Sequence, residues 1–267
     1  MSARSGTRRK RRRRSTAGSR FMTLLLALGG VVALLALLMR LAGPKPAPAA
    51  AVFTAPPVAT AIPSASPEPV PGLPAVDVAS WELRLIDFDH PLGESFEPPE
   101  LTYIGDNESV DSRVAHALNE LIADAKAAGN PVYVCSGYRD YSTQYSIYWE
   151  HIDRYEGQGM TREEADAATR LEVQYPGCSE HQSGLCVDLL ESASQPMEPY
   201  IGGSGLMQWL EENCAGYGFV VRYPDGKTGV TGVEYEPWHL RYVGVEAAGY
   251  MMEHDLCLEE FLALYNM

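Results

Sequence analysis

An uncharged apolar stretch near the N-terminus is the feature that most limits how this chain can fold. The stretch FMTLLLALGGVVALLALLM covers residues 21–39, and a helix needs about 20 apolar residues to cross the hydrocarbon core of a bilayer. Residues 1–45 contain 11 Lys and Arg and no acid, whereas residues 46–267 contain 10 Lys and Arg and 35 Asp and Glu. Basic residues before such a stretch indicate a cytoplasmic N-terminus. We therefore predict a basic cytoplasmic segment at 1–20, a transmembrane signal anchor at 21–41 and an external remainder.

Two features of the same region allow other interpretations. The small residues of APAAA at 47–51 suit a signal-peptide cleavage site, but the apolar part of a cleavable signal usually spans roughly 7–15 residues. The run RRKRRRR at 8–14 suits nucleic-acid binding or nuclear import, but it adjoins the apolar stretch, and the rest of the chain is acidic. A retained membrane anchor is therefore favoured, and no nucleic-acid partner is expected.

A proline- and alanine-rich linker is predicted at 42–78. No apolar periodicity is present there, and such a composition forms a semi-extended spacer that cannot bury a core. The remaining residues, 79–267, suit one domain, with its folded part starting near Trp81. All five cysteines lie in this domain, and an external location permits disulfides, although five cysteines cannot all pair within one chain. The cysteines are Cys135, Cys178, Cys186, Cys214 and Cys257.

The sequence pattern of this domain mixes helices and strands without a regular alternation. A helical stripe within 109–129 ends at Gly129, and its apolar members are Val114, Leu118, Leu121, Ile122 and Ala125. Asp140 and a Thr161-x-x-Glu164 capping box each indicate the start of a further helix. Strands are expected within 131–137, 184–190, 219–224 and 236–244, and a helix within 204–218. We predict an α+β fold with a single catalytic domain, a mainly antiparallel sheet and flanking helices.

A candidate metal site is formed by His181 and Asp188, both in PGCSEHQSGLCVDLL at 176–190. Zinc in a catalytic site usually takes three protein ligands and leaves one position open. The segment YEPWH supplies His239, with Glu236 three residues earlier. A carboxylate beside a metal site suits general-base chemistry. Because Pro237 argues against a continuous helix, we expect a tight turn to direct Glu236 and His239 into one pocket.

A second possible ligand set is Cys178, His181 and Cys186. Cysteine binds zinc well, but the paired C-x-x-C spacing that would support this set is absent from the sequence. Cys186 lies two residues before Asp188, so the two side chains would share one face of a strand. If Cys186 faced the metal, the assignment of Asp188 would be in doubt.

Four blocks of this sequence resemble the VanY-type zinc D-alanyl-D-alanine carboxypeptidases, bacterial enzymes that trim the stem peptides of the cell wall. The blocks are SGYRDYSTQ (136–144), GCSEHQSGLCVDL (177–189), YGFVVRYPDGK (217–227) and TGVEYEPWHLRYVG (231–244). The resemblance implies a Hedgehog/DD-peptidase-like α+β fold, with the metal in a cleft on an antiparallel sheet.

The resemblance also implies a role for each matching residue. One Zn2+ would be held by His181, Asp188 and His239, and Glu236 would be the catalytic base. Arg139 would bind the terminal carboxylate of the substrate. Further substrate contacts are implied for Gln144, Ser179 and Tyr223.

The function implied is removal of the C-terminal D-alanine from peptidoglycan stem peptides. Two alternatives stay open: an L,D-carboxypeptidase that acts on tetrapeptide stems, and a non-catalytic wall-binding module on the same fold. The presence of both Glu236 and Arg139 favours an enzyme. We expect a monomer held in the cell membrane of a Gram-positive bacterium by one N-terminal helix, with residues 79–267 outside.

Overall fold

The computed structural model describes residues 72–265. The predicted cytoplasmic segment 1–20 and membrane anchor 21–41 lie outside these residues, as does most of the predicted linker 42–78. Among the helices of the described part, none combines the length and apolar character that crossing a bilayer requires.

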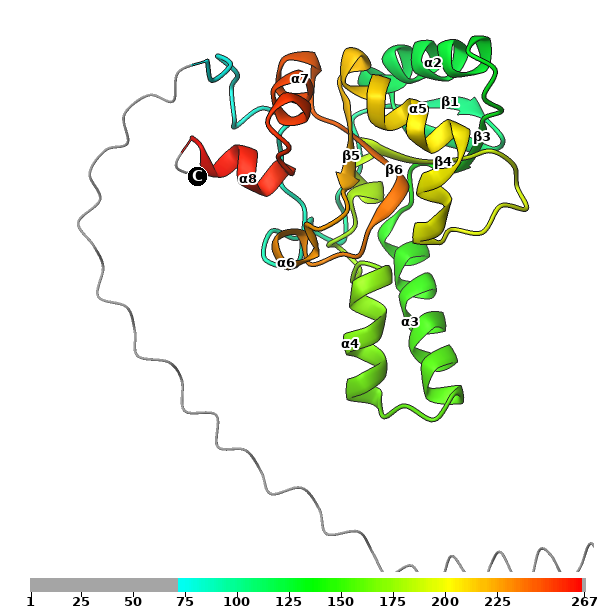
Figure 1. Cartoon of the computed structure of the whole chain (residues 1–267). Coiled ribbons are helices and arrows are strands. Elements are labelled where there is room, and N and C mark those ends of the chain that lie inside the picture. The colour runs from blue at the N-terminus through cyan, green and yellow to red at the C-terminus, as the bar shows by residue number, and fades with distance from the viewer. Residues whose placement is uncertain (1–71, 266–267) are drawn as a thin grey trace, which may run out of the picture. The chain divides into compact units, whose positions relative to one another are not determined.

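The centre of the domain is a four-stranded antiparallel sheet with the strand order β3-β4-β6-β5 (Figure 1). Its strands are β3 (Tyr133–Ser136), β4 (Cys186–Leu190), β5 (Phe219–Tyr223) and β6 (Glu236–Tyr242). Each lies within a segment predicted to be a strand. A separate antiparallel pair, β1 (Leu101–Gly105) and β2 (Glu108–Asp111), was not predicted, and its second strand occupies residues that the sequence pattern had placed in a helix.

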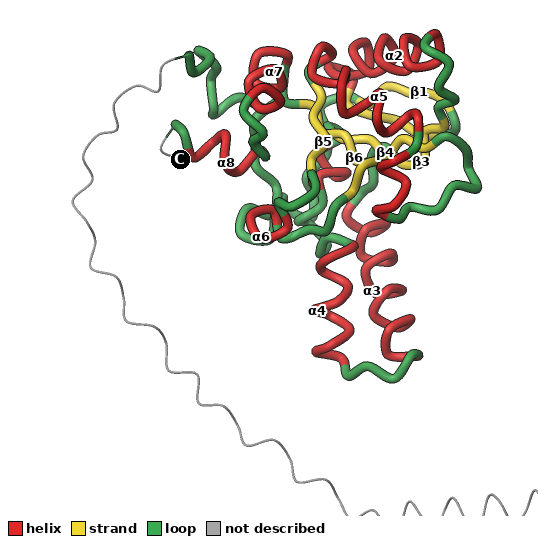
Figure 2. The backbone as a smooth tube through the Cα atoms, in the orientation of Figure 1, coloured by secondary structure: helices red, strands yellow, loops and turns green. Residues whose placement is uncertain are grey.

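Seven helices and three short 3-10 turns are described between residues 72 and 265 (Figure 2). The helices are α2 (Ser112–Ala127), α3 (Tyr141–Gly157), α4 (Arg162–Glu172), α5 (Gly205–Asn213), α6 (Thr228–Thr231), α7 (Val245–Glu253) and α8 (Leu258–Ala263). The 3-10 turns are η1 (Glu180–Ser183), η2 (Pro199–Gly203) and η3 (Cys214–Tyr217). The α+β class and the antiparallel sheet are therefore as predicted.

Local sequence signals correctly placed the starts and buried faces of several helices. All five apolar residues of the predicted stripe are buried in α2. The Asp140 carboxylate accepts a hydrogen bond from the Thr143 amide at the start of α3. Thr161 and Glu164 cap α4 reciprocally, each side chain accepting from the other residue's backbone N–H. These capping groups satisfy amides that would otherwise lack a partner in the first helical turn.

The main hydrophobic core lies between the sheet and helices α2 and α5 (Figure 1). Val187, Leu189 and Leu240 of the central strands are fully buried in it. Because side chains alternate along a strand, the residues between them point to the opposite face. That face therefore carries Asp188 and His239.

Two smaller clusters complete the packing of the domain. Helices α3 and α4 form a hairpin around Tyr148, Ile152 and Ala165, which extends away from the sheet in Figure 1. Helices α7 and α8 form another cluster, and side chains from Leu73 onward pack against it. The chain therefore joins the domain before the predicted boundary at residue 79.

The cysteines form no disulfide in the described part of the chain. All five thiols are free; Cys135 is half-buried and the other four are buried. The disulfides that an external location permits are thus not used in this structure.

Candidate active site

Strands β4 and β6 place Asp188 and His239 directly opposite each other. Their Cα atoms are partners in the antiparallel register, and Asp188 Oδ1 lies 3.0 Å from His239 Nδ1. Both side chains are almost fully buried. This cross-strand pair forms the floor of the site.

An irregularity in the pairing of β5 with β6 brings Glu236 to the same site as His239. Glu236 pairs with Tyr223, whereas Leu240 pairs with Val221, so β6 contains extra residues at this point. Such a bulge turns a strand locally, and it allows two residues three positions apart to face one pocket. The predicted tight turn at 236–239 is therefore wrong, because these residues belong to strand β6. The irregularity in the strand directs Glu236 and His239 to the same pocket, and proline is tolerated at such a position.

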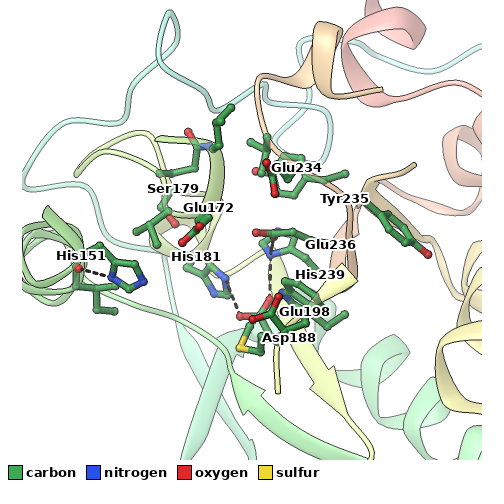
Figure 3. Close-up of a pocket in the computed structure, with 18 of the residues that line it drawn as sticks. His151, Glu172, Ser179, His181, Asp188, Glu198, Glu234, Tyr235, Glu236 and His239 are labelled. Atoms are coloured by element: carbon green, nitrogen blue, oxygen red, sulfur yellow. Dashed lines mark hydrogen bonds and ion pairs between the residues drawn. The ribbon is translucent and has the colours of Figure 1, made fainter. Parts of the chain in front are cut away.

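The 3-10 turn η1 places His181 next to the second carboxylate oxygen of Asp188. His181 Nε2 lies 3.3 Å from Asp188 Oδ2, and the two rings of His181 and His239 meet edge to face (Figure 3). Gly184 ends the turn with a φ of 69°, and a Cβ atom there would lie 2.8 Å from the Asp111 amide nitrogen. A glycine is therefore required where this loop enters β4.

The carboxylate oxygens and imidazole nitrogens of this cluster are suitable ligands for a cation. Asp188 turns one oxygen to each histidine, and neither a carboxylate oxygen nor a bare imidazole nitrogen can donate a hydrogen bond. The remaining nitrogens also face acceptors, since His181 Nδ1 lies 2.6 Å from the Gly137 carbonyl and His239 Nε2 lies 3.5 Å from Glu180 Oε2. Metal-binding histidines are held by second partners of this kind.

The charges of the cluster are strongly coupled. Burial opposes ionisation of Asp188, but His181 and His239 hold its pKa below the ordinary value. Burial and Arg139 lower the pKa of His181, but Cys186 and Asp188 outweigh them and raise it to about 9. Without a metal, protons therefore occupy the positions between the carboxylate and the rings.

Cys186 offers a competing donor. Its sulfur and one nitrogen each of His181 and His239 all lie within 4.8 Å of one another, and Cys178 is not part of this cluster. Burial raises the pKa of Cys186, but the two histidines lower it to about 7. Cys186 does not border the cavity beside the cluster, whereas Asp188 does. Of these two candidate ligands, Asp188 is therefore the one that lies at the cavity.

All of the predicted site residues border one cavity of about 580 Å³. They are Arg139, Gln144, Ser179, His181, Asp188, Tyr223, Glu236 and His239. Figure 3 shows His181, Asp188, Glu236 and His239 converging within it, while His151 and Tyr235 lie towards its margins. The cavity is therefore bordered by the three candidate metal ligands, the Glu236 carboxyl group and the Arg139 guanidinium group.

Arg139 and Gln144 border this cavity, and each has a buried polar atom without a partner among the described residues. Arg139 forms no ion pair with any residue between 72 and 265, and its buried Nε has no hydrogen-bond partner there. Gln144 donates from Nε2 to the Gln174 carbonyl at 2.6 Å, but its Oε1 has no partner within the same part of the chain. Both residues therefore have hydrogen-bonding capacity that the described part of the chain does not satisfy.

Glu236 is held close to the cluster in an environment that favours its protonated form. Its Oε2 lies 3.8 Å from His239 Nδ1. Burial raises its pKa to about 8, and the charge of Asp188 acts in the same direction. A carboxyl group with a pKa near neutrality can both accept and return a proton. Tyr223 lies beside it, with its ring centroid 5.0 Å from that of His239.

A buried ionic network behind the histidines was not predicted. Glu180 Oε1 accepts hydrogen bonds from Arg222 Nε at 2.7 Å and from Arg241 Nη1 at 2.6 Å. All three side chains are buried. Local sequence contains no sign of this, because an acid or an arginine in a polar motif is ordinarily exposed. Only the position of Glu180 directly before His181 hinted at a role.

Two buried histidines and an aspartate on a cavity, with a carboxylate of raised pKa and an unpaired arginine, define a metal-dependent carboxypeptidase. Comparison with known proteins identifies the family to which the chain belongs. The sequence profile of VanY, D-alanyl-D-alanine carboxypeptidase, matches residues 107–245. The chain belongs to this family.

Individual relatives agree with the profile match. The D-alanyl-D-alanine carboxypeptidase of Enterococcus faecalis (strain ATCC 700802 / V583) is 38% identical over 186 residues, which cover 70% of this chain and 67% of that protein. The vancomycin-resistance D,D-pentapeptidase VanY, crystallised as a mutant in complex with Zn(II), is 39% identical with a TM-score of 0.62, covering 68% of this chain and 99% of that one. The LD-carboxypeptidase LdcB is 33% identical with a TM-score of 0.58, covering 67% and 84%.

Proposed function

We propose that this chain is a zinc-dependent carboxypeptidase that removes the C-terminal D-alanine from peptidoglycan stem peptides. One observation carries the proposal: Arg139, unpaired within the described residues, borders the same cavity as the His181, Asp188 and His239 cluster and Glu236. A positive group on the wall of such a cavity selects a substrate that ends in a carboxylate.

One zinc ion would be held by His181 Nε2, Asp188 and His239 Nδ1. Two imidazoles and a carboxylate are an ordinary ligand set for catalytic zinc, and the relative crystallised with Zn(II) supports that choice of metal. When bound, zinc lowers the pKa of a water molecule towards neutrality and polarises the scissile carbonyl.

Glu236 would move the proton. As a carboxylate it accepts a proton from the attacking water, and as a carboxylic acid it returns that proton to the departing amine. Its Oε2 lies 3.8 Å from His239 Nδ1, which places it beside the proposed zinc position.

Arg139 would bind the terminal carboxylate through the parallel hydrogen bonds that a guanidinium group makes with a carboxylate. Gln144 Oε1, which lacks a partner in the described structure, would accept from the substrate, and Ser179 and Tyr223 would complete the walls. These contacts hold the scissile bond against the cluster, so that only the last residue is removed.

The test uses the purified external domain with synthetic pentapeptide and tetrapeptide stems, followed by mass spectrometry. We expect loss of one alanine from the pentapeptide. The Glu236→Ala variant should lose about 100- to 10,000-fold in turnover while keeping its zinc. Glu234→Ala is the matched control, because Glu234 borders the same cavity but forms no ion pair or hydrogen bond with His181 or His239. Equal turnover in both variants would refute the role of Glu236.

An L,D-carboxypeptidase is the second candidate, because LdcB is also similar to this chain. The two activities differ in the shape of the pocket around one methyl group and one stereocentre. Loss of alanine from the tetrapeptide alone would favour this candidate. Loss from neither stem, with zinc bound, would leave a non-catalytic wall-binding module.

We also propose that the domain lies outside the cell, held by the apolar stretch at 21–39. The support is the distribution of charge along the sequence, since the stretch precedes the described residues. Protease added to intact bacteria should then remove the C-terminal domain, with a cytoplasmic protein as the control for lysis. Full protection would contradict the topology.

A further inference from the structure

Glu180 is buried beside His239 and does not border the cavity. We propose that Glu180 is a positioning residue: it accepts the Nε2 proton of His239 and so presents the bare Nδ1 of that ring to the metal. The inference rests on the proposed zinc site, but it assigns a function to a residue outside the ligand set and outside the cavity.

The Glu180 carboxylate is held so that only one of its oxygens is available to His239. Arg222 and Arg241 both donate to Oε1, at 2.7 and 2.6 Å. Oε2 lies 3.5 Å from His239 Nε2, at the long end of hydrogen bonding, and the Cys186 thiol is a further neighbour of the His239 ring. The ring therefore has a carboxylate oxygen at each nitrogen, with Asp188 Oδ1 at Nδ1.

The two arginines are themselves anchored to other parts of the domain. Arg222 donates to both oxygens of Glu259 in α8, at 2.9 and 2.7 Å. Arg241 Nη2 donates to the carbonyls of Glu82 and Arg84, at 3.0 and 2.8 Å. Because neither guanidinium group can swing away, the carboxylate between them has a fixed orientation.

The orientation of the Glu180 carboxylate influences which nitrogen of the His239 ring carries the proton. A neutral imidazole carries its proton on one nitrogen and binds a metal through the other. An ionised carboxylate can only accept a hydrogen bond, so Glu180 favours the proton on Nε2 and leaves the lone pair of Nδ1 facing Asp188. A glutamine would turn its oxygen to the arginines and its NH2 group to the ring, which would place the proton on Nδ1, where the metal must bind.

The first experiment compares zinc affinity, by chelator competition, in the wild-type external domain and the variants Glu180→Gln and Glu259→Gln. Loss of a second partner of a ligating histidine typically weakens metal binding by about 10- to 100-fold, and we expect this for Glu180→Gln. Glu259→Gln removes a carboxylate charge but still offers Arg222 an acceptor oxygen, and it leaves Arg241 and His239 untouched, so it should keep the wild-type affinity. Equal affinities in the two variants would overturn the proposal.

The second experiment does not depend on the folding of a variant. Nitrogen-15 NMR of the zinc-loaded wild-type protein should show His239 protonated at Nε2 and bound through Nδ1. A proton on Nδ1 would overturn the proposal. Both readouts are independent of peptide hydrolysis, so a protein that binds zinc as described and cleaves no stem peptide would refute the proposed function alone.

Discussion

At the scale of single residues, the site contains two candidate ligands on the same face of β4. Asp188 and Cys186 both lie close to His181 and His239. They differ in position, because Asp188 borders the cavity and Cys186 does not, although both are almost fully buried. This position favours Asp188 as the ligand, since hydrolysis needs a coordination position that the substrate can reach.

The Cys186→Ala variant tests this choice. We expect it to keep wild-type zinc affinity, and we expect the cobalt-loaded wild-type protein to lack a thiolate-to-cobalt charge-transfer band. Cys214→Ala is the control, because this thiol is equally buried but belongs to the main core. A charge-transfer band that disappears only in Cys186→Ala would place the sulfur on the metal.

Arg139 gives a second prediction at this scale. A hydrogen bond to a charged group contributes about 1.5–3 kcal/mol, so Arg139→Lys, which loses the paired geometry, should lower kcat/KM by about 10- to 150-fold. Arg154→Lys is the control, since Arg154 borders the same cavity but is paired with Glu172 at 3.2 Å. The measurement is kcat/KM on a stem peptide with a free C-terminus. An equal loss in both variants would count against a specific role for Arg139.

At the scale of secondary-structure elements, the site depends on how segments distant in sequence approach one another. Gly137 follows β3, and its carbonyl accepts from His181 Nδ1, while its amide donates to Glu108 Oε2 at 2.7 Å. The chain therefore connects β2, β3 and η1 through one residue without a side chain.

Gly137→Ala should disrupt this junction. A Cβ atom at residue 137 would lie 2.3 Å from the backbone oxygen of Ser109, and such overpacking costs about 1–3 kcal/mol. We expect a loss of this size in the free energy of unfolding in urea, together with weaker zinc binding. Gly249→Ala in α7 meets nothing within 4 Å and should instead stabilise the domain by about 0.5–1 kcal/mol. Unchanged stability of Gly137→Ala would contradict the packing described for this junction.

At the scale of the whole molecule, metal binding is linked to the protonation of the domain. Zinc can bind only when both imidazoles are free of the proton that otherwise lies towards Asp188. The pKa of His181 is raised to about 9, so at lower pH a proton competes with the metal.

We therefore expect zinc affinity to rise with pH up to and beyond about pH 9, with protons released on binding, because the pKa of His239 is also raised well above its ordinary value. Chelator competition across this range gives the affinity, and calorimetry in two buffers of different ionisation enthalpy gives the proton release. An affinity that does not change with pH would contradict the coupling between His181 and Asp188.

The sequence alone determined those features that depend on neighbouring residues. The caps at Asp140 and Thr161 and the buried stripe of α2 follow from hydrogen bonds and spacings within a few residues. The family resemblance selected His181, Asp188, His239 and Glu236, and the structure brings all four to one cavity. The division between a basic, apolar N-terminus and an acidic remainder is likewise visible in composition.

The tertiary structure decided those features that depend on the pairing of distant segments. The bulge in β6 aligns Glu236 with His239, and it results from the register with β5, which no local pattern encodes. The burial of Glu180 between Arg222 and Arg241 joins a loop to two strands. The exclusion of Cys186 from the cavity arises in the same way, because burial is set by what the rest of the fold places over a residue.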